Sequence, residues 1–448
     1  MVIRRAPTQA ELVTRLHEDG SLPERFLKII TTRIGVAPEG RYRHWDSLRH
    51  LSPPGDLSVD EWWLGVKIAR TTILRKLPLI DSAGDALSYA MPDQALELLH
   101  FIDQHASGEI AMPEVVTADE SARRHYLVNS LMEEAIRSSQ LEGASTTRPV
   151  AKEMIRTGRP PRDRSERMIL NNYNALRFLR EDAASRLTPA LVMELHRILT
   201  EGTLDNPDGA GRLQGPNDER VAVWNAQTNE IVHAPPAATE LEGRLHTLCA
   251  FANGELEVEG FLHPVVRAIL LHFMLGYDHP FEDGNGRTAR ALFYWAMRKQ
   301  GYWLAEYLSI SRILREAPAQ YGRSFMYTET DEGDTTYFIL YQLHVIKRAM
   351  RELRDYLERK VSEVREVERL IRQSDEYNHR QLALLGNAVR SPDQRYTFSS
   401  HARSHNVSIQ SARHDLLDLL QRGLLTRRRV GHKFVFAPVA GLSEQLND

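Results

Sequence analysis

The residues best suited to chemistry lie together at positions 279–290, with the sequence HPFEDGNGRTAR. His279 can take or give a proton near neutral pH. Asp283 offers hard carboxylate oxygens, which suit Mg²⁺ beside phosphate groups. Gly284 and Gly286 let the backbone approach a ligand with no Cβ in the way. A base, a metal ligand and a glycine turn within one short stretch indicate phosphoryl or nucleotidyl transfer.

Helices are predicted on both sides of this stretch. Apolar residues recur at helical spacing before it, from Val265 to Met274, and after it, from Ala289 to Met297. Proline and the two glycines interrupt the pattern between them. We therefore expect a helix, a short loop and a second helix whose N-terminus opens on the glycine turn.

Two arginines, Arg287 and Arg290, fall in the first turn of the second predicted helix. The helix dipole disfavours cations there unless an anion receives them, and the free N–H groups of a helix N-terminus bind phosphate. The pattern therefore predicts a phosphate site.

The stretch resembles the signature of the Fic family, His-Pro-Phe-x-Asp-Gly-Asn-Gly-Arg-x-x-Arg, at every specified position. The resemblance implies a protein adenylyltransferase (an AMPylator), which transfers AMP from ATP to a Ser, Thr or Tyr hydroxyl of a target protein. It implies His279 as the catalytic base and Asp283 as the Mg²⁺ ligand. The implied nucleotide-binding residues are Gly284, Asn285, Gly286, Arg287, Arg290 and, from a later segment resembling the adenosine side of the pocket, Tyr321. Phosphate transfer, a sister chemistry of the fold, goes with an altered glycine turn, and here both glycines are intact.

A second Fic-like motif ends a predicted amphipathic helix at residues 119–143. Glu142 lies in the last turn of this helix, where the dipole disfavours a carboxylate, and Gly143 follows as a stop signal. A solvated surface glutamate is the plain alternative. The sequence SSQLEG, however, resembles the Fic inhibitory motif Ser/Thr-x-x-x-Glu-Gly/Asn. This resemblance implies that Ser138 and Glu142 are inhibitory and that Glu142 pairs with Arg290 in the space of the ATP γ-phosphate.

Two short β-prone runs at residues 221–224 and 231–233 predict a hairpin. In Fic proteins a hairpin flap holds the target segment by main-chain pairing, as an added strand. The implied target-docking residues are Val221, Val223, Ile231 and Val232. Gln214 stands where the family commonly has the arginine of Gly-x-aromatic-Arg, so an expected support of the flap is missing.

The predicted fold is mainly α: a Fic helical bundle with a β-hairpin flap, an N-terminal helical region and a C-terminal winged helix. We expect an N-terminal region at 1–115 and a Fic domain at 116–340, with the inhibitory helix at 119–143. A connector helix at 341–375 and a winged-helix-like domain at 376–448 are expected to follow.

The segment 377–438 is basic and resembles a winged helix in its order of helix, helix-turn-helix and hairpin. Arg413 and residues 427–429 are suited to DNA phosphates. Many winged helices bind only proteins, so DNA binding and protein docking are equal alternatives. The competing function for the whole chain is a DNA-binding regulator whose Fic core acts only as a nucleotide sensor.

The composition of the chain limits its possible partners and its location in the cell. The chain has 448 residues and a formal net charge of −3, which favours no class of partner. The single cysteine, Cys249, excludes an internal disulfide. No apolar run reaches the ~18 residues of a membrane helix, and the N-terminus does not resemble a secretory signal. We expect a cytoplasmic protein with ATP and a protein target as partners, and with self-modification and a homodimer as further candidates.

Overall fold

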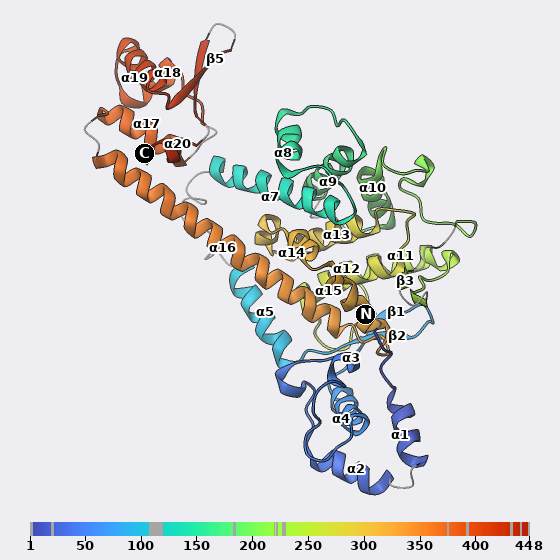
Figure 1. The fold of residues 1–448 in the computed structure, drawn as a ribbon. Coiled ribbons are helices and arrows are strands. Elements are labelled where there is room, and N and C mark those ends of the chain that lie inside the picture. The colour runs from blue at the N-terminus through green and yellow to red at the C-terminus, as the bar shows by residue number, and fades with distance from the viewer. Residues whose placement is uncertain are drawn as a thin grey trace. The chain divides into compact units, whose positions relative to one another are not determined.

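The computed structural model describes residues 3–18, 22–106, 120–181, 185–218, 220, 223–225, 230–373, 376–390, 394–430, 433–439 and 441–446. Contacts divide the chain into two compact units. The first draws on Met1–Gly108 and Ser130–Met350, and the second on Glu109–Asn129 and Arg351–Asp448. Figure 1 shows a mainly helical chain, as expected, whose described strands form three separate two-stranded sheets.

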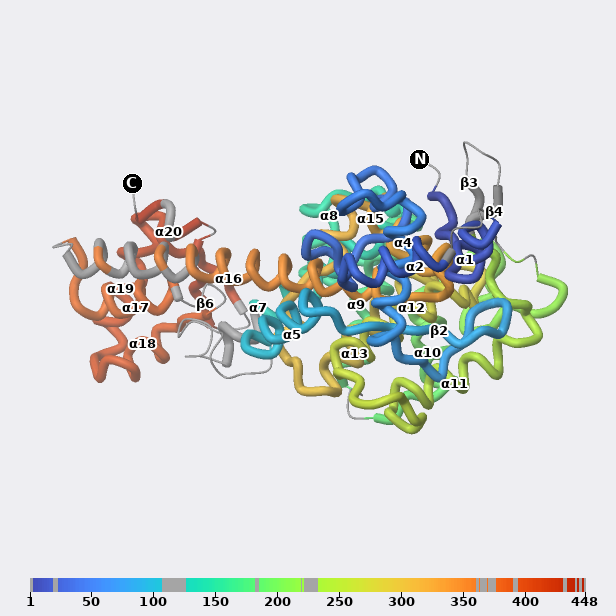
Figure 2. The backbone as a smooth tube through the Cα atoms, turned by 90° about the horizontal axis from the view of Figure 1, so that it is seen from below, coloured from blue at the N-terminus to red at the C-terminus, as the bar shows by residue number. Residues whose placement is uncertain are grey.

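The first unit begins with a small tryptophan-centred core. Its N-terminal helices are α1 (Gln9–Glu18), α2 (Leu22–Thr31), α3 (Trp45–Leu48) and α4 (Val59–Thr71). Helices α1, α2 and α4 lie side by side in both views (Figure 1 and Figure 2). Trp45, Trp62 and Trp63 are buried among them and form part of one hydrophobic core.

A β-hairpin that we did not predict follows this core. Strands β1 (Arg75–Ile80) and β2 (Ala86–Tyr89) pair antiparallel, with Arg75 opposite Tyr89. Leu77 and Leu79 are buried while their neighbours are not, so the period-two alternation of a strand is present in the sequence. Helix α5 (Asp93–Ala106) comes next.

The remaining helices of the first unit form a bundle around α12 (Pro264–Asp278). They are α8 (Arg148–Thr157), α9 (Arg164–Glu181), α10 (Pro189–Thr200), α11 (Leu241–Asn253), α13 (Asn285–Lys299), α14 (Ile310–Glu316) and α15 (Pro318–Glu329), together with the part of α7 (Glu120–Leu141) from residue 130 and the part of α16 (Thr336–Gln373) up to residue 350. Cys249 is buried in α11. Helix α12 is apolar nearly all round and almost wholly buried, as expected for a helix enclosed by others. The core helix of the bundle is therefore also the helix that ends at His279.

The predicted flap forms between α10 and α11. Strands β3 (Val223–Asn225) and β4 (Glu230–His233) pair antiparallel, with Trp224 opposite Ile231 and an irregular register beside Val223. Val223, Ile231 and Val232 therefore lie on the hairpin. Val221 lies outside the described residues.

The second unit contains helices α17 (His379–Arg390), α18 (Phe398–His405), α19 (Ile409–Gln421) and α20 (Leu442–Gln445) and strands β5 (Leu425–Val430) and β6 (Lys433–Pro438). The order of α17, α18, α19 and the β5–β6 hairpin is the order expected from the sequence, and α20 is an additional short helix that was not expected. Leu385, Leu416 and Phe436 are completely buried in its own core. Asp415 ties the helices together, since it accepts hydrogen bonds from Arg380 at 2.7 and 3.0 Å.

Among the described residues, every helix is too short or too polar to cross a membrane.

Candidate active site

The stretch 279–290 forms a tight loop between α12 and α13. His279 ends α12 in the left-handed conformation (φ 46°), with its N–H bonded to the Leu275 carbonyl at 3.2 Å. The side chain of Asn285 closes the loop. Its Oδ1 accepts from the Phe281 N–H at 2.9 Å, and its Nδ2 donates to the Phe281 carbonyl at 2.7 Å. Because both ends of this amide are used, Asn285 shapes the loop from within.

Gly284 and His196 fix the turn that starts α13. Gly284 has φ 85°, and a Cβ there would meet the Thr200 side chain at 2.8 Å. His196 of α10 stacks on Phe281 with ring centroids 3.8 Å apart. Its Nδ1 accepts from the Gly211 N–H at 3.0 Å, so Nε2 carries the proton that is donated to the Asp283 carbonyl at 2.8 Å. Burial lowers the pKa of His196 to about 4, which keeps this arrangement neutral.

Sequence reasoning did not identify His196. Its neighbours in the loop are far away in the chain, and its position on α10 carries no motif.

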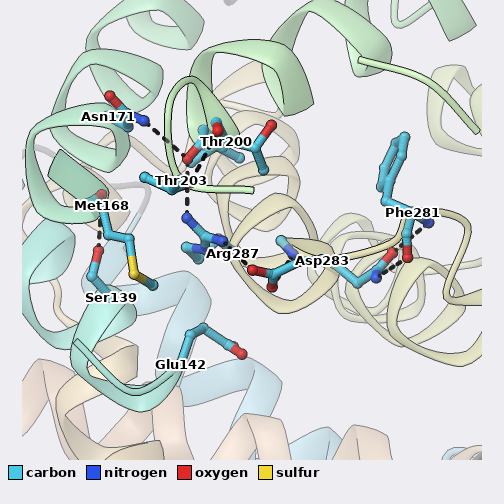
Figure 3. Close-up of polar contacts among 12 residues, drawn as sticks. Ser139, Glu142, Met168, Asn171, Thr200, Thr203, Phe281, Asp283 and Arg287 are labelled. Atoms are coloured by element: carbon cyan, nitrogen blue, oxygen red, sulfur yellow. Dashed lines mark hydrogen bonds and ion pairs between the residues drawn. The ribbon is translucent and has the colours of Figure 1, made fainter. Parts of the chain in front are cut away.

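Arg287 is completely buried between the end of α10 and Asp283 (Figure 3). Its Nη1 donates to the Leu199 carbonyl at 3.0 Å, and its Nη2 lies 3.4 Å from Asp283 Oδ2. The Asp283 side chain is 43% exposed, so one of its oxygens faces a cation while the group stays open to solvent. Asp283 is therefore an accessible carboxylate held beside the N-terminus of α13.

Arg290 is buried and bound by the end of α7. Its Nε donates to Ser138 Oγ at 2.9 Å, and its Nη2 donates to the Ser138 carbonyl at 3.1 Å and to Glu142 Oε1 at 2.8 Å. One oxygen of Glu142 therefore makes the contact, and Ser138 binds the rest of the guanidinium. Glu142 and Arg290 are 148 residues apart in sequence.

Glu142 also lies directly against the glycine turn. A Cβ added to Gly286 would be 2.2 Å from Glu142 Oε1. The carboxylate therefore stands over the first turn of α13, where backbone N–H groups and the helix dipole favour an anion. The chain itself supplies an anion to the place where the sequence predicts a phosphate.

The His279 side chain is mostly buried at the other end of the loop. Its Nδ1 lies 3.4 Å from the Gly276 carbonyl, an acceptor, which leaves Nε2 with the free lone pair. Burial lowers the pKa of His279 below its ordinary value, so the imidazole is neutral at neutral pH. A neutral imidazole with one unprotonated nitrogen has the form of a general base.

Arg220 provides the support that was expected from an arginine at the position of Gln214. Its guanidinium donates to the carbonyls of Asp278 at 2.7 Å, His279 at 2.8 Å and Pro236 at 3.1 Å. It also donates to Gln214 Oε1, and the Gln214 N–H donates to the Pro280 carbonyl at 2.9 Å. One arginine thus joins the segment that follows the flap to the backbone that carries His279.

His233, the last residue of β4, fastens the flap to two helices. Its Nδ1 is 2.8 Å from Glu329 Oε2 on α15, and its Nε2 is 2.8 Å from the Tyr277 carbonyl on α12. Both partners accept hydrogen bonds, so the ring carries protons on both nitrogens. Burial lowers its pKa, but the bonds to Glu329 and Tyr277 outweigh burial, and the net shift is upward.

Tyr321 lies on α15 behind these groups. Its hydroxyl is 2.8 Å from His272 Nε2 of α12. Burial raises the pKa of Tyr321, while Arg290 lowers it, so the tyrosine and the arginine are close neighbours. Its assignment to the adenosine side of the pocket stays a prediction.

Comparisons with known proteins place a named domain on this part of the chain. Residues 186–297 match the model of the Fic/DOC family. A protein adenylyltransferase Fic of Nematostella vectensis is 26% identical over 215 residues, covering 46% of this chain and 45% of its own. The protein of the same name from Drosophila sechellia is 39% identical over 136 residues, covering 30% of this chain and 25% of its own. The chain therefore spans less than half the length of these curated relatives.

A solved structure shares the fold. The crystal structure of a Fic family protein from Desulfovibrio desulfuricans has a TM-score of 0.50 and 17% identity, and covers 78% of this chain and 96% of that chain. The family match spans α10 to α13 and includes the whole loop at 279–290. The likeness of this chain to the Fic/DOC family therefore rests on residues 186–297.

Proposed function

We propose that the protein is an ATP-dependent protein adenylyltransferase, which transfers AMP to a hydroxyl of a target protein. The observation that carries the proposal is the loop itself. A neutral His279 and the buried Arg290 lie at the two ends of one short segment, and the accessible Asp283 lies between them, just before the start of α13. The adenylyltransferase relatives support AMP transfer as the chemistry.

In this proposal His279 takes the proton from a Ser, Thr or Tyr hydroxyl. The hydroxyl oxygen bonds to the α-phosphorus of ATP, the bond from that phosphorus to the bridging oxygen breaks, and pyrophosphate leaves. Positioning and charge neutralisation provide most of the catalysis in such transfers. Gly284 and Gly286 give the phosphates access to the backbone N–H groups of α13. Arg287 and Arg290 neutralise charge beside them.

Asp283 is the group that fits a metal ion in this site. Mg²⁺ usually binds through one or two carboxylates together with substrate phosphates, and Asp283 is one exposed carboxylate beside the proposed phosphate site. When bound, the ion would neutralise charge on the phosphates. Asp283→Ala should weaken ATP binding when Mg²⁺ is present and change it little in EDTA. Equal ATP affinity of both proteins in Mg²⁺ would assign Asp283 to the turn alone.

Glu142 and Ser138 are proposed to inhibit this activity. Glu142 takes the guanidinium of Arg290 and stands against Gly286, where the terminal phosphate of a productive ATP would lie. ATP would then bind without its α-phosphorus in line for attack.

The flap is proposed to present the target segment to His279. Strands β3 and β4 offer a main-chain edge to an extended segment, and His233 and Arg220 tie this region to the end of α12. Another protein and the chain itself are both candidate substrates that this hairpin could present.

The test of the proposal uses ATP radiolabelled on either phosphate. Label from the α-phosphate should appear on protein, and label from the γ-phosphate should not. The Glu142→Gly variant gives the strongest signal, and the same variant with His279→Ala serves as the control. Protein labelled only from the γ-phosphate would establish phosphate transfer instead, and no labelling from either position would leave nucleotide sensing.

DNA binding by the second unit is the other candidate function. Arg413 on α19 and residues 427–429 on β5 are exposed. The second unit also has a hydrophobic core of its own. Counterion release makes DNA affinity fall steeply with salt. Retardation of duplex DNA by the full chain that weakens with salt, and that Arg413→Gln reduces, would support it. No retardation at low salt would leave protein docking.

A further inference from the structure

A second cavity lies on another side of α15. It has a volume of about 460 Å³, within the range of roughly 300–1,000 Å³ that is usual for ligand pockets. Gln320, Arg323 and Tyr327 line it from α15. Glu329, which binds the flap, follows Tyr327 by two residues and so points to nearly the opposite face of the helix. No residue of the loop 279–290 lines the cavity.

The cavity is cationic. Arg41, Arg43 and Arg323 line it, and none of its lining residues in the described part of the chain is acidic. Arg43 Nη2 pairs with Glu39 at 3.1 Å, while its Nε is buried and has no hydrogen-bond partner among the described residues. Arg41 and Arg323 have no ion pair within the described ranges. Three guanidinium groups without a lining carboxylate favour an anionic ligand.

His344 on α16 reports the same positive field. Its Nε2 is 2.8 Å from Gln94 Nε2, a donor, so the ring accepts there. Burial lowers its pKa, and the cations of Lys347 and Arg41 lower it further. The lowered pKa of His344 therefore supports a positive charge of Arg41 at this wall of the cavity.

Aromatic side chains form much of the remaining lining of the cavity, and several of them are held by hydrogen bonds or stacking. Tyr42 donates to Asp334 at 2.6 Å, and Tyr337 donates to Asp331 at 2.6 Å. His44 stacks on Tyr327 with centroids 4.3 Å apart. Tyr341 is partly exposed at the cavity. Aromatic faces beside guanidinium groups suit a ligand that joins a planar ring to a phosphate.

We infer that this cavity binds a nucleoside phosphate at a site separate from the ATP of the proposed reaction. Arg41 and Arg323 bind the phosphate, with Arg43 beside them. Tyr327 and Tyr341 contact the base. The inference does not depend on AMP transfer, because it rests on residues outside the loop and the flap.

A photoreactive azido analogue of AMP tests the inference on the full chain. The experiment uses the His279→Ala protein, so that transfer of AMP contributes no label, and the labelled peptides are identified by mass spectrometry. We expect label on the peptides that contain Tyr327 or Tyr341. Arg323→Gln and Arg41→Gln should each reduce that label about tenfold. Arg315→Gln, an exposed arginine on α14 outside the cavity, should not change it.

Three results would overturn the inference. Label confined to the peptide of the loop 279–290 would leave a single nucleotide site. Label at Tyr327 or Tyr341 that survives both arginine substitutions would remove the phosphate contact. Inorganic phosphate or a phosphotyrosine peptide competing as well as AMP would show that the nucleoside is not recognised. Unchanged circular dichroism and unfolding midpoints of the variants ensure that a loss of label reports binding.

Discussion

Two groups of arginines in the first unit are held in opposite ways. At the loop, Arg287 and Arg290 are buried, and each faces a carboxylate that the chain provides, Asp283 and Glu142 respectively. At the cavity beside α15, Arg41 and Arg323 are partly or fully exposed and have no ion pair among the described residues. A buried charge needs a partner, because an unpaired one loses its hydration without compensation.

The difference separates two kinds of ligand site. In the proposed function, an incoming phosphate at the loop competes with Glu142, so the activity would depend on a residue that takes no part in the chemistry. At the cavity, no carboxylate of the described residues pairs with Arg41 or Arg323, so a ligand there would displace no such carboxylate. Substitutions at the loop should therefore change rates in both directions, whereas substitutions at the cavity should only weaken binding.

The largest expected effect is the loss of the base. His279→Ala should lower AMP transfer by about 10²–10⁴-fold, because the neutral imidazole no longer takes the proton. ATP binding, measured by calorimetry, should persist because the phosphate contacts lie elsewhere in the loop. The cavity should be unaffected.

His246→Ala provides the matched control for this prediction, since His246 is exposed on α11. A transfer rate of His279→Ala close to that of the wild type would remove His279 from the mechanism and with it the catalytic half of the comparison.

Substitution of Arg220 should lower the transfer rate by a smaller factor, because Arg220 positions the base and does not take part in the chemistry. Arg220→Gln breaks the bonds to the carbonyls of Asp278 and His279, so the base should shift. Small displacements of a reacting group cost up to about 10²-fold, and we expect a fall of kcat of about 10–10²-fold with KM for ATP little changed. Arg220→Lys should recover only part, because an ammonium lacks the planar fork.

The control for Arg220 is Arg212→Gln, which removes a surface pair with Asp218 on the same segment. If Arg220→Gln and Arg212→Gln gave equal kcat values, Arg220 would have no positioning role.

The smallest effect is a pH-dependent fastening of the flap. The pKa of His233 lies above the ordinary histidine value of 6.5. Burial lowers this pKa, but Glu329, the Tyr277 carbonyl and Asp278 together raise it more. A raised folded-state pKa gives stabilisation that is complete below pH 6.5 and is lost as the pH rises through the raised value. Charged hydrogen bonds of this kind contribute about 1.5–3 kcal/mol.

Urea unfolding of wild type and His233→Gln between pH 5 and 9 measures this contribution. The difference in unfolding free energy should be largest at low pH and should shrink as the pH rises. His246→Gln, on an exposed histidine, should show no such trend. A difference that grows with pH would contradict the pairing.

Patterns that are local in sequence allowed much of the fold to be predicted. The apolar period of α12 and α13, the cap at Gly143 and the hairpin around the flap all lie within short windows. The hairpin β1–β2 was missed although Leu77 and Leu79 alternate, because the surrounding region was interpreted only for helices. An alternation test across residues 75–89 would have found it.

Only part of the candidate site could be predicted from the sequence. The loop residues form a motif, and the contact of Glu142 with Arg290 was expected from the resemblance; the structure shows that it is made through one carboxylate oxygen. His196 and Arg220 were not found, because most of their partners are backbone groups, which leave no trace in residue identity. Gln214 pointed to a missing arginine but not to the residue that replaces it.

The central claim is that an internal carboxylate occupies the phosphate position of an adenylyltransferase. The measurement is the initial rate of AMP incorporation by wild type, Glu142→Gly and Glu142→Gly/Arg290→Ala. Freeing a shielded guanidinium should raise the rate of Glu142→Gly about 10-fold or more, and Glu142→Asp should give a smaller rise because its shorter side chain keeps the charge but reaches less far. Loss of the gain in the double variant would assign it to Arg290. Equal rates of wild type and Glu142→Gly would contradict the claim and return Glu142 to the surface.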